Sequence, residues 1–465
     1  MSLSRFVLLI GATLLLCLEA FGQGMTLPPV TRTELDNGVV LILSEKHDVP
    51  LIGVRAAILG GATSDPEDRA GLASLLAGML EKGAGDRDAA AFADAIAAVG
   101  GELSAQGGRE AITVSAEFLA RDADLLVELL ADMLQRPALE ASEMQKLRDR
   151  SINLIRAAKD SSLGALVPRY GSAFLFGDHP YGRPAGGSEE SLGKISHKDL
   201  LAYYNDHVGA DRLVIAVVGD FETAGMQEKL TTAFGEWRKA GVEPIEVVAA
   251  EPQRGNRVLL VDKPGATQTY FWLANVGVAI DYPQRAELNI ANTVFGGRFT
   301  SMLMTELRIK AGLTYGARSI LRRPSRSGSV VISSFTETST TVEAIDLALD
   351  VLEQLRDSGL DDDMVLSARN YIMGQFPPRL ETASQIAAQF AMLEHYGLDI
   401  AYINEYGAAL EAASRDSITA VIEEVYPLPE DLTFILIGDA ALIREDVSQY
   451  GPVKEVSIDA PQFRQ

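Results

Sequence analysis

The chain has 465 residues, of which 47% are hydrophobic and 23% are charged. This composition is that of a globular protein long enough for two or more domains. A formal net charge of −23 excludes the basic footprint that nucleic-acid binding requires, and it argues against an acidic membrane surface as a partner.

The N-terminus has the pattern of a secretory signal peptide. Arg5 precedes the apolar run Phe6–Leu18, and Ala20 and Gly22 are small residues suited to cleavage after Gly22. The alternative is a membrane anchor, but the run is too short for a spanning helix, so we expect no stable anchor. Cys17 is the only cysteine, and an exported chain without disulfides fits a bacterial periplasm.

From Leu35 onward, strand and helix patterns alternate. Asp36-Asn37-Gly38 is a hairpin signal, and Asp65-Pro66 predicts the start of a helix that continues through Leu80. Further strands are predicted over 39–43, 51–59, 102–105, 111–118 and 213–220, and further helices over 88–99, 120–134, 140–159 and 196–204.

The second half of the chain repeats the first. A shift of 216 residues aligns Asp65, Arg69, Ala70 and Leu72 with Asp281, Arg285, Ala286 and Leu288. A repeat this long predicts two homologous domains, 27–239 and 257–460, joined by a polar linker over 240–256. Each half mixes hairpin strands with helical blocks, so we predict an α+β fold with helices on one face of a mostly antiparallel sheet.

Gly296–Ser319 contains the residues most suggestive of chemistry. It predicts a glycine turn, a helix that ends at Lys310 and Gly312, and a strand opening at Leu313. Arg308 and Tyr315 lie on either side of that corner, where a cation and a phenol could face a cavity. The alternative is a helix-surface arginine and a half-buried strand tyrosine.

The spacing GG-x-F-T-S-x-L-x-x-x-LR-x-K-x-GL-x-Y over 296–315 resembles the C-terminal signature of the insulinase-like (pitrilysin, M16) zinc peptidase family. Other matching segments are His179–Gly182, Gly187-Ser188, Val217–Asp220, Gln268 and Ser417–Val421. The resemblance implies a clam-shell of two domains that encloses a peptide substrate. It also implies that Arg308 and Tyr315 hold the scissile carbonyl opposite a zinc ion.

The zinc half of that site is missing. Active members carry HxxEH on the first long helix and a second Glu later; here the matching positions are Ser74, Ala77, Gly78 and Leu154. Leu, Ala and Gly offer no donor atom, and a Ser hydroxyl is a poor zinc ligand. The five histidines are scattered, with no HxxxH and no cysteine pair, so we expect no metal or other cofactor on this chain.

Among family members, this division occurs in two-subunit peptidases. The resemblance therefore implies a partner subunit with HxxEH and zinc, while this chain supplies Arg308 and Tyr315 and is not active alone. The alternative function is a non-catalytic scaffold or peptide-binding protein in which the two residues only pack. Fold alone does not decide between them.

Overall fold

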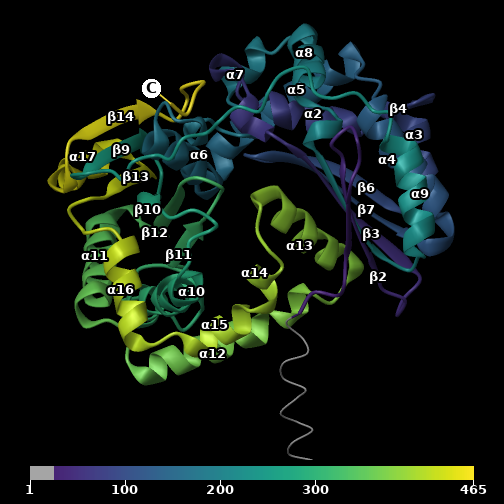
Figure 1. Cartoon of the computed structure of the whole chain (residues 1–465). Coiled ribbons are helices and arrows are strands. Elements are labelled where there is room, and N and C mark those ends of the chain that lie inside the picture. The colour runs from purple at the N-terminus through teal and green to yellow at the C-terminus, as the bar shows by residue number, and fades with distance from the viewer. Residues whose placement is uncertain (1–25, 465) are drawn as a thin grey trace, which may run out of the picture.

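The computed structural model describes residues 26–464, and the predicted signal peptide lies outside them. Two six-stranded mixed sheets, each flanked by helices, form the two halves of the molecule. Figure 1 shows the first sheet on the right, the second on the left and helix α13 between them. Within the described residues, no helix has the length and apolar character needed to cross a membrane.

The first sheet has the strand order β1-β2-β8-β3-β7-β6. β2 and β8 are parallel, and the other neighbours are antiparallel. The predicted hairpin joins β1 to β2, with Asn37 donating to the carbonyl of Phe234 at 2.7 Å. The strands are β1 (Thr31–Glu34), β2 (Val40–Glu45), β3 (Leu51–Leu59), β6 (Glu102–Gly107), β7 (Ala111–Leu119) and β8 (Leu213–Gly219), with a separate small pair, β4 (Gly83–Ala84) and β5 (Arg87–Asp88).

The second sheet has the order β11-β12-β10-β13-β9-β14. Read from its other edge, this order matches the first sheet, since β9, β13, β10, β12 and β11 take the places of β2, β8, β3, β7 and β6. The predicted α+β class is therefore confirmed. The strands are β9 (Arg257–Asp262), β10 (Gln268–Gly277), β11 (Arg318–Arg322), β12 (Gly328–Glu337), β13 (Thr433–Gly438) and β14 (Val453–Ser457).

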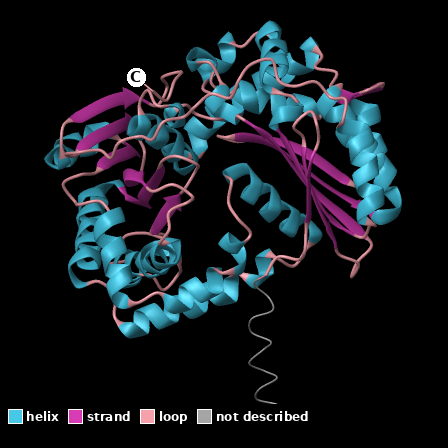
Figure 2. Ribbon diagram, in the orientation of Figure 1, coloured by secondary structure: helices cyan, strands magenta, loops and turns pink. Residues whose placement is uncertain are grey.

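Most helices cover the outer face of their own sheet (Figure 2). In the first half they are α2 (Leu72–Leu80), α3 (Ala89–Ala97), α4 (Ala123–Gln135), α5 (Ala141–Ser161), α6 (Leu163–Phe176), α7 (Glu189–Lys194), α8 (His197–His207) and α9 (Thr223–Phe234). In the second half they are α10 (Arg285–Asn292), α11 (Thr341–Ser358), α12 (Asp362–Gln375), α13 (Ala383–Tyr396), α14 (Ala401–Asn404), α15 (Tyr406–Ala412), α16 (Arg415–Val425) and α17 (Ala440–Val447).

Two helices cross to the opposite half, which adds to the predicted layer of helices on one face of each sheet. α13 packs on β3 and β8 of the first sheet, where Phe390 joins a buried cluster with Ile42 and Val218. α6 packs on β10 and β13 of the second sheet. The approach is close, because a Cβ added at Gly171 would lie 2.4 Å from the Trp272 ring. Each sheet is thus flanked on both faces, and the exchange ties the halves together.

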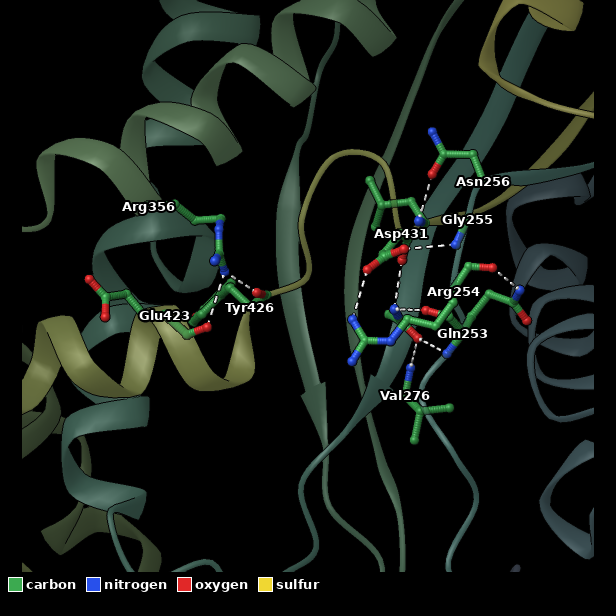
Figure 3. A network of polar contacts seen from close by, with 11 residues as sticks. Gln253, Arg254, Gly255, Asn256, Val276, Arg356, Glu423, Tyr426 and Asp431 are labelled. Atoms are coloured by element: carbon green, nitrogen blue, oxygen red, sulfur yellow. Dashed lines mark hydrogen bonds and ion pairs between the residues drawn. The ribbon is translucent and has the colours of Figure 1, made fainter.

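Residues 240–256, the predicted linker, contain no helix or strand. The end of this segment is fastened to the loop before β13 (Figure 3). Asp431 accepts a hydrogen bond from the Gly255 amide at 2.7 Å and forms an ion pair with Arg254 at 3.0 Å. The Asn256 side chain accepts from the amide of Leu432 at 2.7 Å. These bonds hold the start of β9 beside β13.

The helix predicted to start at Asp65-Pro66 begins later, at Leu72. Asp65 is buried and accepts hydrogen bonds from the amides of Gly71 at 2.8 Å and Ala73 at 2.9 Å. It therefore satisfies the free amides at the start of α2 from outside the helix. Gly71 has a positive φ of 99°, which favours glycine where the chain turns into α2.

Candidate functional site

Arg308 lies on a π-helical segment, Met304–Lys310, that is packed against the second half's core. Leu303 and Leu307 are fully buried in that core. Lys310 forms an ion pair with Glu306 at 2.7 Å one turn earlier. A π-helical segment has a wider turn than an α-helix and often occurs at functional sites. Leu307 on this segment and Leu303 just before it fix the backbone that carries Arg308.

Tyr315 lies on a loop, not on the strand that was predicted to open at Leu313. The strand β11 begins at Arg318. The loop is held to β12 instead, because Ser334 donates to the Gly316 carbonyl at 3.0 Å and Thr336 donates to the Leu313 carbonyl at 2.8 Å. Tyr315 is therefore displayed on an anchored loop.

The Arg308 guanidinium contacts two aromatic rings, 5.3 Å from the centroid of Tyr315 and 4.9 Å from that of Phe299. Tyr315 is 81% exposed and Phe299 is 59% exposed. Within the described part of the chain, neither the guanidinium nor the Tyr315 hydroxyl has a hydrogen-bond partner. Both donors are thus available to a ligand, and cation–π contact keeps the guanidinium beside the phenol.

Phe299 is the member of this cluster that the sequence reasoning missed as a site residue. It belongs to the same signature, three residues after Gly296. Ile309, next to Arg308, is also exposed, so three large apolar side chains lie exposed within 299–315. Such apolar surface beside unpaired donors is typical of a binding site. The signal in the sequence was a phenylalanine directly after a glycine turn, because a residue in a turn is usually exposed to solvent.

The degenerate helix α2 packs closely on the edge strand β6. Ser74 donates to the Ala185 carbonyl at 2.7 Å. Its Cα lies 2.4 Å from where a Cβ at Gly107 would be. A serine hydroxyl committed to a carbonyl is not free to bind a metal ion. Ser74 therefore ties α2 to the neighbouring loop.

The other three predicted positions do not form a metal site either. Ala77 is buried, and the space beside Gly78 is taken by Leu147 of α5, whose Cδ2 lies 2.7 Å from where a Cβ would be. Leu154 is 61% exposed and lies two helical turns beyond Leu147. Of these positions, Gly78 therefore lies against α5, with Leu147 as the contacting side chain. The residues at these four positions do not fit zinc.

Elsewhere in residues 26–464, no group of three or more histidine, cysteine, aspartate or glutamate side chains is placed to bind a metal ion. His47, for example, contacts two carboxylates but does not belong to such a group. It lies 2.7 Å from Asp220 and 3.3 Å from Glu45, at the surface. The hydrogen bond with Asp220, followed by the one with Glu45, raises the pKa of His47 above its ordinary value. This contact is a surface ion pair between β2 and the end of β8.

Two family models match the chain in succession. Residues 40–188 match the insulinase (peptidase family M16) model, and residues 194–372 match the peptidase M16 inactive domain. The Arg308–Tyr315 cluster lies within the second match, and the degenerate positions on α2 and α5 lie within the first.

Curated relatives and solved structures agree with these matches. A zinc protease of Mycobacterium tuberculosis is 27% identical over 88% of this chain and 92% of its own length. A non-peptidase homologue of Helicobacter pylori, YmxG, is 23% identical over 90% of this chain and 96% of its own length. The crystal structure of a peptidase M16 inactive domain from Pseudomonas fluorescens superposes with a TM-score of 0.82 at 20% identity, covering 88% of this chain and 98% of that one. The chain belongs to the M16 peptidase family.

Proposed function

We propose that this chain is the Arg/Tyr-bearing subunit, without zinc, of a heterodimeric M16 metallopeptidase in the periplasm. In this proposal a second M16 subunit supplies the HxxEH motif and its zinc. Arg308 and Tyr315 of this chain donate hydrogen bonds to the carbonyl oxygen of the bound peptide. Export by the predicted signal peptide would place both subunits in the same compartment.

One observation carries the proposal. Arg308 and Tyr315 form an exposed pair of unpaired donors, whereas Ser74, Ala77 and Gly78 are packed as ordinary structural residues. The donors lie beside the exposed apolar side chains Phe299 and Ile309, and such surface is typical of a binding site. Donors aimed at a developing oxyanion are among the largest contributions to acyl-transfer catalysis. The pair can therefore contribute to turnover on a chain that binds no metal.

A second candidate is a non-catalytic peptide-binding scaffold, and the edge strand β6 favours it. β6 pairs with β7 on one side only, and its residues alternate between exposed and half-buried. An open edge can accept an extended peptide as an added strand. One relative is itself described as a non-peptidase homologue. Under this reading, peptide would bind at β6, and Arg308 and Tyr315 would not affect any hydrolysis.

The test is reconstitution with the exported M16 subunit that has an intact HxxEH, encoded in the same genome. We expect the chain alone to contain no stoichiometric zinc and to cleave no peptide, and the mixture to cleave. Arg308→Ala and Tyr315→Phe should each lower kcat of the mixture by about 10²–10³-fold without preventing assembly. Arg121→Ala and Tyr371→Phe are matched controls, since both residues lie at the surface outside the cluster.

Three outcomes would contradict the proposal. Stoichiometric zinc with cleavage by the chain alone would mean that the metal positions are assigned incorrectly. Unchanged turnover in both cluster variants, with peptide still bound, would favour the scaffold. The absence of any exported HxxEH chain in the genome would favour it as well.

A further inference from the structure

A cavity of about 530 Å³ lies between the two halves, apart from the Arg308–Tyr315 cluster. Its walls come from both sheets and from the crossing helices, with Ala57 on β3, Phe176 on α6 and Ala391 on α13 among the apolar residues. This volume falls within the range of small-molecule and peptide-end sites, which is roughly 300–1,000 Å³. The exchange of α6 and α13 thus leaves a half-open, partly apolar space between the two halves.

Four arginines line this cavity in a chain that is otherwise strongly acidic: Arg55, Arg109, Arg322 and Arg323. Burial lowers the pKa of Arg55, of Arg322 and of Arg109, and the nearby charge of Arg322 lowers the pKa of Arg109 further. Like charges gathered in a space of low dielectric repel one another strongly. Such a cluster is costly unless an anion compensates it.

The described part of the protein compensates this charge only in part. Arg109 donates to the Tyr181 carbonyl and lies near the charge of Glu110, and Arg323 donates to the Asn289 side chain at 3.2 Å. No carboxylate among the described residues forms an ion pair with any of the four arginines. Glu110 lines the cavity, but it accepts hydrogen bonds from the Tyr181 hydroxyl at 2.5 Å and the Ser325 amide at 3.1 Å. Arg55 Nε, Arg323 Nη1 and His395 Nδ1 are buried without a hydrogen-bond partner. Unpaired buried donors beside a cavity point to an anionic ligand.

We propose that this cavity binds the C-terminal carboxylate of a peptide whose last side chain is apolar. Arginine matches a carboxylate with two parallel N–H donors, and the alanine, methionine and phenylalanine walls accept the adjoining side chain. Inorganic phosphate would satisfy the charge but would leave these walls uncovered. The choice of a peptide rests on the proposed function, whereas the recognition of an anion rests on the arginines alone.

Calorimetric titration of the full-length mature chain, without any partner, tests this proposal. The probes are acetyl-Ala-Ala-Leu with a free carboxylate, the same peptide as its C-terminal amide, and inorganic phosphate. We expect the acid to bind at least about tenfold more tightly than the amide, because the amide loses a charge-assisted hydrogen bond. Equal binding of acid and amide would overturn the proposal. Phosphate that binds more tightly than the acid would overturn the assignment to a peptide end.

Two variants on different sheets locate the binding. Arg55→Gln on β3 and Arg322→Gln on β11 should each weaken binding of the acid by at least about tenfold and leave the amide unchanged. Arg121→Gln is the matched control, because it removes the same charge from a side chain that is 76% exposed. If Arg121→Gln weakens binding as much, the effect is one of net charge, and the cavity is not the site.

Thermal unfolding separates a binding role from a structural one. Without ligand, Arg55→Gln and Arg322→Gln should unfold at the same or a higher temperature than the wild type, since each relieves repulsion among the arginines. A lower unfolding temperature with unchanged affinity for the acid would show that these arginines serve the fold. Because no peptidase partner takes part, the result stands independently of whether Arg308 and Tyr315 contribute to hydrolysis.

Discussion

Arg308 and Tyr315 come from two differently anchored segments, and the guanidinium and the phenol ring meet with 5.3 Å between them. The first segment is fixed by buried leucines and the second by hydrogen bonds to Ser334 and Thr336 on β12. The Phe299 ring is a second neighbour of the guanidinium, with its centroid at 4.9 Å. The position of the cation therefore depends on both rings.

Phe299→Ala should loosen Arg308 without unfolding the protein. An exposed cation–π contact contributes about 0.5–1 kcal/mol, and removal of an exposed side chain changes stability by no more than about 0.5 kcal/mol. We expect turnover of the reconstituted peptidase to fall a few-fold, with an unchanged urea midpoint. Phe299→Tyr, which keeps the ring, should restore turnover. A Phe299→Ala subunit as active as the wild type would show that Tyr315 alone holds the guanidinium.

Gly78→His restores one lost metal position and should destabilise the chain. The new Cβ would meet Leu147 Cδ2 at 2.7 Å; this methyl group can rotate away, so we expect a cost of about 1 kcal/mol, at the lower end of the range for overpacking. Leu147→Ala in the same chain should recover part of the loss, because it removes the opposing side chain. Urea unfolding of the two single variants and the double variant measures this coupling. Additive effects would mean that the imidazole avoids Leu147.

The strands were predictable because their signals are local. The apolar run of β8 and the Asn37-Gly38 turn each lie within a few residues of sequence. The exchange of α6 and α13 was not predictable, since the apolar face of a helix does not specify which sheet it will cover. Gly171 lets α6 approach the Trp272 ring. The sequence does not show that this ring lies against α6, so the glycine alone could not predict the contact.

Of the candidate site, the proximity of Arg308 and Tyr315 was predictable from the sequence, and their role stays a prediction. The corner placed Arg308 and Tyr315 near each other, and the structure finds them in contact. The cavity arginines escaped notice because they come from three separate segments of the chain. Arg55, the one charged residue within the apolar strand β3, was the available signal, since an unpaired charge in a buried strand is rare.

Asp65 predicts a measurable pH dependence of stability. Burial raises the pKa of its carboxyl to about 7, although the hydrogen bonds from Ala73 and Gly71 act in the opposite direction. In the unfolded chain the pKa is about 3.9. Between these two values the folded state binds more protons than the unfolded state, so this group lowers the free energy of unfolding as pH rises. The loss is complete once the pH exceeds about 7 and is on the order of 4 kcal/mol.

Asp65→Asn removes this titration and keeps a side-chain oxygen that can accept one of the two amide hydrogen bonds. As the pH rises from about 4 to about 7, the wild type loses the contribution of Asp65 and the variant does not. The free energy of unfolding of Asp65→Asn should therefore increase relative to that of the wild type over this range. Urea titrations of both proteins at several pH values give the difference directly. Parallel curves would show that the hydrogen bonds from Gly71 and Ala73 outweigh burial and keep the carboxyl ionised.

The docking of α13 on the first sheet depends on the absence of a side chain at Gly53. A Cβ there would lie 2.5 Å from the Ser384 amide nitrogen and 2.7 Å from its Cα. These are backbone atoms and cannot rotate away, so Gly53→Ala should lower the free energy of unfolding by about 1–3 kcal/mol. Gly225→Ala on α9 is the matched control, because nothing lies within 4 Å of its added Cβ. That variant should gain up to about 1 kcal/mol from helix propensity.

The same pair tests whether α13 shapes the central cavity. Met392 and His395 of α13 line that cavity, so a shift of the helix by Gly53→Ala should weaken binding of the free-carboxylate peptide, while Gly225→Ala leaves it unchanged. Urea unfolding and calorimetry on the two variants measure both effects. If Gly53→Ala is as stable as the wild type, the backbone of α13 at Ser384 lies farther from Gly53 in solution than the 2.5 Å contact requires. The two halves would then be joined chiefly through α6 and the Glu110–Ser325 contact.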